Sequence, residues 1–264
     1  MCNNNSILPD VIEPISNAIH QNLPSTEKET DGALSTVVGF FNNVVLYPVK
    51  KANLTFRYKL ESFEDDLKEK IKCIPEEHLQ VPPTMIAGPT LEALRYAYDE
   101  DKLREMYENL LASAMDKRIV SNAHPAFVDA VKQMTPIEAR IIEIIAQNSD
   151  SLKCAEITFD IKNSTTHYGK AMPEYFVEEL YELGDPFIIS SSITNLVRLG
   201  IVRVTILGLT GQNYDSFRSH PYVLARKALF ETFGREFQVN ISEHALMLND
   251  YGKQFAKICL KKEV

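Results

Sequence analysis

The side chains best suited to chemistry in this sequence are its six histidines and a small polar set in the middle of the chain. The histidines are His20, His78, His124, His167, His220 and His244. They are separated by tens of residues, and none lies in an HxE, HxxxH or HExxH pattern that would bring two metal ligands together. His124 and His220 each precede a proline, a context typical of the entrance to a helix. We interpret the histidines as loop or capping residues.

The polar set combines one predicted helix with residues that follow it. Its members are Glu92, Arg95, Tyr96, Asp116 and His124. Carboxylate, imidazole and guanidinium groups gathered in one cleft would supply an acid, a base and an anion-binding group. The alternative is an arginine–carboxylate pair that fixes the geometry of the helices around it. The GxSxG, GxxxxGK[ST] and GxGxxG patterns are absent, so we predict no catalytic site and no enzymatic activity.

The four cysteines, Cys2, Cys73, Cys154 and Cys259, indicate neither a zinc site nor a disulfide framework. They are widely spaced and form no CxxC pattern. Thiols used in this way are typical of a reducing cytoplasm, where they serve as small apolar side chains. We therefore expect a cytoplasmic protein without a metal or a cofactor.

Charge is distributed unevenly along the 264 residues, whose formal net charge is −8. Residues 1–185 carry 18 basic and 30 acidic side chains, a net charge of −12, whereas residues 186–264 carry 10 and 6, a net charge of +4. The negative total argues against attraction of the whole molecule to nucleic acid or anionic lipid. Solvated faces are one explanation of the asymmetry, and a locally basic binding surface near the C-terminus is the other.

Residues 33–49, ALSTVVGFFNNVVLYPV, form the most apolar stretch and are a candidate for membrane or groove contact. The candidate contact residues are Phe40, Phe41 and Val45. Two lysines follow the stretch, as they would in an interfacial anchor. However, it is shorter than a typical membrane span, and Asn42 and Asn43 lie at its centre, where burying an amide in hydrocarbon is costly. We predict a helix that packs on protein or lines a groove, with membrane insertion as the alternative.

The N-terminal half is organised around residues 82–116. The prolines and the glycine at its start predict a bend, after which a helix begins near Pro89. Three consecutive acidic residues at 99–101 predict the cap of a second helix, which has a wide apolar face. Residues 51–74 predict a long amphipathic helix before this pair. We expect the two helices after the bend to pack as a hairpin.

The C-terminal half differs from the N-terminal half in that predicted helices alternate with predicted strands. Thr135 and Glu138 form a capping box that opens its first helix. The sequence then predicts strands at 154–161, 201–209 and 244–248, and helices at 173–183, 186–199, 221–239 and from 250 onward. This order resembles a winged helix-turn-helix with an insertion near its wing.

In a winged helix, the helix before the wing is the recognition helix. Here it is residues 186–199. The side chains expected to lie outward as candidate nucleic-acid or partner contacts are Ser190, Ser191, Thr194, Asn195 and Arg198, with Arg203 on the wing. Those expected on the buried side are Ile188, Ile189, Ile193, Leu196, Val197 and Leu199. Short polar side chains with arginine suit base edges and phosphates. Because the chain is acidic, we favour protein binding over the reading of DNA.

Four segments resemble the bacterial abortive infection alpha (Abi-alpha) family. They are TMIAGPTLEALRYAYDEDKLREMYENLLASAMDKR, HPAFVDAVKQMTPIEARII, SITNLVRLGIVRV and LNDYGKQFAKIC. The family has long been catalogued as a domain of unknown function. The resemblance implies an antiphage role, and it transfers no catalytic residue because the family has no established active-site motif.

Together these observations predict a mainly α protein with a small β component. We expect a flexible segment over residues 1–31, a helical domain with the hairpin over 32–134, and a winged-helix-like α+β domain over 135–264. The predicted function is antiphage abortive infection through binding of a protein partner. Two alternatives remain, a membrane-active effector that uses residues 33–49 and a winged-helix regulator that binds nucleic acid. The oligomeric state is left open.

Overall fold

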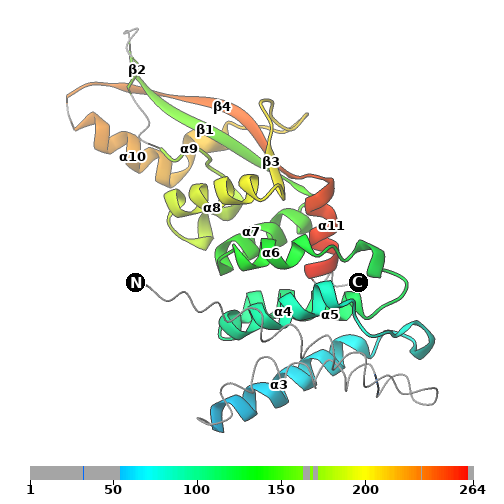
Figure 1. Cartoon of the computed structure of the whole chain (residues 1–264). Helices are drawn as coiled ribbons and strands as arrows, with labels where there is room; N and C mark the ends of the chain where they lie inside the picture. Colours follow the sequence, from blue (N-terminus) through cyan, green and yellow to red (C-terminus); the bar gives the residue numbers. More distant parts are fainter. Residues whose placement is uncertain (1–31, 33–53, 163–166, 169–171, 233, 261–264) are drawn as a thin grey trace, which may run out of the picture. The chain divides into compact units, whose positions relative to one another are not determined.

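The computed structural model describes residue 32 and residues 54–162, 167–168, 172–232 and 234–260 (Figure 1). The chain divides into two compact units between Lys132 and Gln133, two residues before the boundary expected from the sequence. Each unit is described by itself. The described residues are mainly helical with a small antiparallel sheet, which confirms the predicted fold class.

The first unit is helical in its described part. Its helices are α3 (Leu54–Ile71), α4 (Thr84–Ala97), α5 (Asp101–Ala114) and α6 (Ala126–Lys132), with 3-10 turns η3 (Glu76–His78) and η4 (Val120–Asn122). Helices α4 and α5 pack against each other, as the predicted hairpin requires, and α5 also packs on α3 and α6. Phe63, Leu91 and Leu110 from three of these helices are fully buried and form the apolar core.

The predicted bend before α4 is wrong. Helix α4 already begins at Thr84, and Pro89 lies inside it rather than in its first turn. A proline inside a helix leaves the carbonyl four residues earlier, here that of Met85, without its backbone hydrogen bond. Both side chains are exposed, so this carbonyl lies on the side of the helix where water can satisfy it. Helix α5 begins after Glu100 as expected, although no side chain caps it.

The second unit combines helices with the sheet. Its elements are α7 (Pro136–Gln147), β1 (Ser151–Ile161), β2 (His167–Tyr168), η5 (Glu178–Leu183), α8 (Pro186–Arg198), β3 (Val202–Val204), α9 (Ser216–Ser219), α10 (Pro221–Glu231), β4 (Phe237–Leu248) and α11 (Asp250–Cys259). The sheet is antiparallel with the strand order β2-β1-β4-β3. Strands β1 and β4 pair along their whole length, with Ser151 opposite Met247 and Ile161 opposite Phe237.

An aromatic core fills the space between this sheet and α9 and α10 (Figure 1). Phe159 on β1 and Phe237 on β4 contribute to it from the sheet, and Phe217 contributes from α9. The ring of Phe176 stacks on that of Tyr222 with 5.9 Å between the ring centroids. Aromatic rings bury large apolar areas, so this core accounts for much of the cohesion of the unit.

Helix ends in the second unit follow their sequence signals. The capping box of α7 is present, because the backbone N–H of Thr135 donates to Glu138 at 2.7 Å. The Asn249 side chain accepts from the backbone N–H of Gly252 and caps α11. Helix α8 ends before Gly200, whose φ of +70° suits glycine and turns the chain into β3.

Three predicted elements have different extents in the structure. The helix expected over 221–239 ends at Glu231, and Phe237 already begins β4. The strand expected over 201–209 shortens to β3, and the helix expected over 173–183 is reduced to η5. Gly234, at a φ of +78°, separates α10 from β4, and pairing with β1 then makes the next residues a strand.

Candidate functional site

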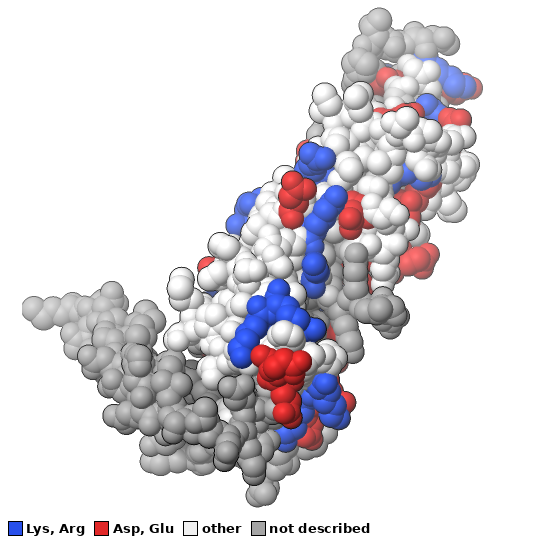
Figure 2. Space-filling model, turned by 90° about the vertical axis from the view of Figure 1, so that its right-hand side faces the viewer, with Lys and Arg blue, Asp and Glu red and all other residues white. Residues whose placement is uncertain are grey.

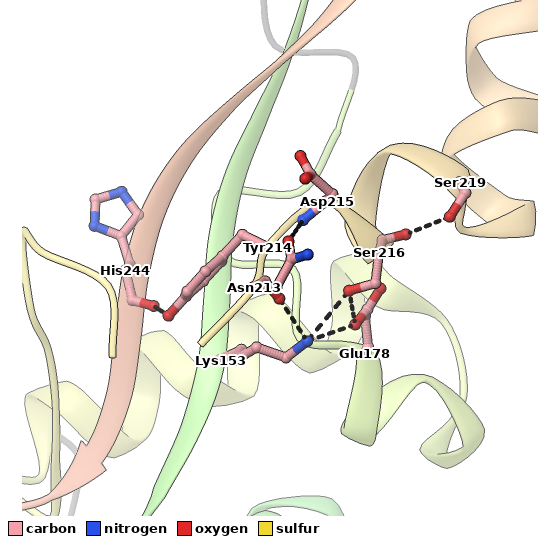
Figure 3. Close-up of polar contacts among 8 residues, drawn as sticks. All are labelled: Lys153, Glu178, Asn213, Tyr214, Asp215, Ser216, Ser219 and His244. Atoms are coloured by element: carbon pink, nitrogen blue, oxygen red, sulfur yellow. Dashed lines mark hydrogen bonds and ion pairs between the residues drawn. The ribbon is translucent and has the colours of Figure 1, made fainter. Parts of the chain in front are cut away.

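A polar cluster around Lys153 contains several side chains that could take part in chemistry and that hydrogen-bond to one another (Figure 3). The ammonium nitrogen of Lys153 on β1 lies 3.3 Å from a carboxylate oxygen of Glu178, 3.2 Å from the carbonyl oxygen of Asn213 and 3.2 Å from the hydroxyl of Ser216. The Ser216 hydroxyl donates to the same Glu178 oxygen at 2.8 Å. The three side chains therefore point at one another from β1, η5 and α9.

A serine beside a lysine is the arrangement of a nucleophile and its general base. A base needs a free lone pair, yet Lys153 faces the Glu178 carboxylate and lies over the rings of Tyr214 and Phe217, at 5.9 Å and 5.4 Å from their centroids. Its nitrogen is thus engaged by a carboxylate, a backbone carbonyl and a hydroxyl, with two ring faces beside it. The cluster is therefore built as a cross-link between three elements and not as an activated serine.

Tyr214 fixes the loop that leads into α9. Its hydroxyl donates to the carbonyl oxygen of His244 at 2.6 Å (Figure 3). The same hydroxyl accepts from the backbone N–H of Leu209 at 2.9 Å. Burial raises the pKa of this phenol. A side-chain nitrogen of His244 lies 2.7 Å from the Thr205 carbonyl oxygen, which ties the same loop to β4. Tyr214 and His244 therefore hold the loop in place.

In the first unit, Glu108 on α5 is a buried carboxylate whose side chain is 4% exposed. Burial raises its pKa to about 7, against the lowering effect of Lys70, and Asp66 raises it further while Arg104 lowers it. The ammonium of Lys70 lies 3.7 Å from one Glu108 oxygen, and the guanidinium of Arg104 lies 3.6 Å from the other. A carboxyl group that titrates near neutral pH is a candidate proton donor or pH sensor. It was not singled out from the sequence.

The polar set proposed from the sequence is distributed over separate local roles. Asp116 is buried and binds Arg118 through both carboxylate oxygens, at 2.9 and 2.6 Å, and this hydrogen bonding lowers the pKa of Asp116. His124 accepts from the backbone N–H of Ala126 at the start of α6. His220 likewise caps α10, so the predicted helix-entry role of both histidines is confirmed. Glu92 and Tyr96 are exposed on α4. The Arg95 side chain lies outside the described part.

The outward face of α8 differs from its prediction in three positions. Ser190 is only 6% exposed, and its hydroxyl accepts from the backbone N–H of Tyr175 at 3.1 Å. It shares the buried side of the helix with Ile189 and Ile193, to which it is adjacent at helical spacing. Conversely, Ile188 and Val197, expected on the buried side, are 54% and 39% exposed. The sequence pattern therefore misplaced the docked side of α8.

We define the α8 face as the solvent-facing side chains of this helix. They are Phe187, Ile188, Ser191, Thr194, Val197 and Arg198. Phe187 is 43% exposed, and the guanidinium of Arg226 on α10 lies 5.9 Å from the centroid of its ring. The face is thus apolar over its first turn, short and polar in the middle, and bordered by an arginine at each end.

Comparison with known protein families gives one match, over residues 55–259, to the family described as abortive infection alpha. The chain belongs to the abortive infection alpha family. No curated protein and no solved structure matches it. The match begins in α3 and ends with the last residue of α11, so it includes the Glu108 site, the Lys153 cluster and the α8 face. The predicted membrane or groove stretch at 33–49 precedes it.

The remaining nucleic-acid candidates of this Abi-alpha protein are partly occupied by intramolecular bonds. The Asn195 amide donates to the carbonyl oxygen of Gln133 at 3.0 Å and to a Glu138 oxygen at 3.1 Å. Arg198 is exposed and donates to the Gln133 side chain at 3.1 Å and to Asn195. The Thr194 hydroxyl donates back to the carbonyl of Ser190, and Ser191 and Arg203 are exposed, as Thr194 and Arg198 are.

Charges on the Abi-alpha surface alternate in sign on the face drawn in Figure 2. Lysine and arginine side chains lie beside aspartate and glutamate there, and on the described part of this face they do not merge into one continuous basic surface. A protein that binds a nucleic-acid backbone without sequence reading needs such a surface.

Two further predictions concern segments and thiols. Phe40, Phe41 and Val45 lie outside the described residues, and among the described ones no helix is both long and apolar enough to cross a membrane. Cys154 and Cys259 are buried as the sequence suggested, and burial raises the pKa of the Cys154 thiol to about 12. Within the described part, no group of three or more His, Cys, Asp or Glu side chains is placed to hold a metal ion.

Proposed function

We propose that this Abi-alpha protein serves in antiphage abortive infection by binding a protein partner through the α8 face. Family membership supports the association with phage defence. The observation that carries the binding role is the exposure of Phe187, Ile188 and Val197 on a helix whose other side is well buried. Exposed large apolar side chains beside polar and charged ones are typical of protein-interaction sites.

The order of elements in the second unit is compatible with this role. Helix α8 precedes β3, β3 pairs with β4, and β4 pairs with β1, an order that supports the winged-helix arrangement as part of this proposal. The helix in this position is the one that winged-helix modules present to partners. The exposed Arg198 and Arg203, together with the net charge of +4 over residues 186–264, support nucleic-acid binding as a second candidate function.

The test replaces Phe187 and Ile188 with aspartate in the full chain. Both side chains are largely exposed, so we expect the folded structure and the thermal midpoint to be retained within a few degrees. In cells in which the wild-type chain reduces phage plating, the double variant should lose that protection, because charge would prevent apolar contact with the partner.

The matched control is Met85→Asp, which places the same charge on an exposed apolar position of α4 in the other unit. It should protect as well as the wild type. Full protection by the Phe187→Asp, Ile188→Asp variant would exclude the α8 face as the binding surface. A wild-type chain that leaves plating unchanged over a broad phage panel would contradict the defence role itself.

A further inference from the structure

The α8 face lies within a segment of the chain that carries an excess of basic side chains. Residues 186–235 contain six basic side chains and two acidic ones. Both acidic side chains are already paired, Asp215 with Arg218 at 3.7 Å and Glu231 with Lys227 at 3.0 Å. The excess positive charge of this segment is therefore not balanced by its own carboxylates.

Two of these basic side chains border the α8 face at opposite ends. Arg226 lies over the Phe187 ring next to the N-terminus of α8, and Arg198 is in its last turn. Eleven residues of helix separate positions 187 and 198, which is about 16 Å along the axis. Asp185, which precedes α8, accepts from the backbone N–H groups of Phe187 and Ile188 at the helix N-terminus.

Exposed side chains recur along α8 at the spacing that suits packing against a second helix. Phe187, Ser191, Thr194 and Arg198 follow one another at intervals of four, three and four residues. Such a row forms a ridge that fits between the side chains of another helix. The short serine and threonine in the middle allow close approach, and Ile188 and Val197 widen the apolar strip on either side.

We propose that the α8 face docks an acidic amphipathic helix of a protein partner. The partner helix presents an apolar strip to Phe187, Ile188 and Val197, and carboxylates near its two ends meet Arg226 and Arg198. This inference rests on the proposed function and adds the chemistry of the partner. Complementary charge determines which helix binds, while the apolar strip supplies the free energy of association.

The experiment uses two synthetic helical peptides that differ only in charge. Both carry the same leucine strip over about four turns, with glutamates at both ends in the first and lysines in the second. Fluorescence anisotropy with the full chain should show at least about tenfold tighter binding of the glutamate peptide. Phe187→Asp should abolish that binding, and Arg198→Glu should remove most of the preference between the peptides.

Arg235→Glu is the matched control, since it reverses an exposed arginine of the same segment outside the α8 face. It should leave the preference intact, and far-UV circular dichroism verifies the fold of each variant. Equal binding of the two peptides, or preference for the lysine peptide, overturns the inference. So does peptide binding that persists in the Phe187→Asp variant, or a duplex DNA oligonucleotide that binds this face independently of Phe187 and depends on Arg198.

The phage-plating assay distinguishes a failure of the acidic-helix inference from a failure of the proposed function. If Phe187→Asp abolishes protection while Arg198→Glu retains it and the peptides bind equally, the α8 face binds a partner that is not an acidic helix. If Phe187→Asp, Ile188→Asp retains full protection, the proposed function fails together with the inference. Self-association measured by sedimentation would show whether a second copy of the chain occupies the face instead.

Discussion

Two glutamates, one in each unit, have a lysine as neighbour and yet have opposite surroundings. Glu178 is part of a cluster in which lysine, serine and carboxylate all bond to one another. Glu108 is more deeply buried, and one of its oxygens has no hydrogen-bond partner although the Arg104 guanidinium lies 3.6 Å away. The comparison shows that proximity of opposite charge does not by itself compensate for burial.

The positive groups near Glu108 direct their hydrogen bonds elsewhere. Lys70 donates to the side chain of Asn109 at 2.8 Å, and Arg104 donates to the Tyr98 carbonyl at 2.9 Å and pairs with Asp101 at 2.9 Å. Glu108 is thus left with long ionic contacts, and burial dominates its pKa. We therefore expect the stability of the first unit to vary with pH through Glu108, and the stability of the second unit to depend mainly on close packing.

The largest effect is expected from Gly252→Ala, which tests the packing side of this comparison. A Cβ at Gly252 would lie 2.0 Å from the carbonyl oxygen of Ile201, so α11 would have to move away from the chain that enters β3. We expect the second unit to lose about 3 kcal/mol or more of its free energy of unfolding. Urea denaturation followed by far-UV circular dichroism, with hydrogen exchange of β4 amides, measures this loss.

Gly88→Ala is the control for that variant, because a Cβ at Gly88 in α4 meets nothing within 4 Å. It should change the free energy of unfolding of the first unit by no more than about 1 kcal/mol, because the higher helix propensity of alanine is opposed by the proline that follows it. A Gly252→Ala variant as stable as the wild type would show that α11 has room to shift, and would remove the contrast in packing.

Most of the fold could be predicted from the sequence where helix caps and turn residues agree with the pattern of apolar side chains. The ends of α7, α8 and α11 carry caps or a glycine that the structure uses as expected. The first half of β4 was assigned to a helix because its strand character comes from pairing with β1, which is distant in the sequence. Pro89 was placed at a helix start because the local rule favours proline in the first turn, whereas the structure has it inside α4.

The candidate site was less predictable than the fold. Both sides of α8 contain isoleucine and serine, so the pattern could not tell which side docks onto the unit, and Ser190 and Ile188 were exchanged. Glu108 looks like any charged residue of an amphipathic helix, and only the packing of α3 on α5 buries it. Lys153 and Ser216 are far apart in the sequence, and the fold alone brings them together.

The second prediction concerns pH and the first unit. Burial raises the pKa of Glu108 to about 7 in the folded protein, against an ordinary value of 4.5, so the folded state binds more protons between these values. The contribution of Glu108 to the stability of the unit is therefore largest below pH 4.5 and is lost as pH rises through 7, by on the order of 3 kcal/mol in total. Glu108→Gln removes the titration and should flatten the dependence. Urea denaturation at pH 5, 6, 7 and 8, with exchange of α5 amides, measures it.

Glu105→Gln is the matched control on the same helix. The Glu105 side chain is 38% exposed and pairs with Lys102 at 3.2 Å. Neutralising this carboxylate should therefore leave the pH dependence of stability unchanged. If Glu108→Gln retained the fall in stability between pH 5 and pH 8, another group would be responsible, and the distinction between the two units would not rest on Glu108.

The smallest effect on stability is expected at the Lys153 cluster. Variants of this cluster test whether its side chains form a structural cross-link or a reactive site. The side chains of Lys153 and Glu178 are 19% and 20% exposed, so a double-mutant cycle of Lys153→Met and Glu178→Gln should give a coupling free energy of about 1 kcal/mol or less. Ser216→Ala removes one hydrogen bond from the same cluster and should lower the free energy of unfolding by a similar amount. All three variants should still protect cells from phage, because a cross-link can be weakened without loss of the α8 face. A folded Ser216→Ala variant that no longer protects would instead show that this serine reacts, since a structural hydroxyl worth so little stability cannot account for complete loss of function.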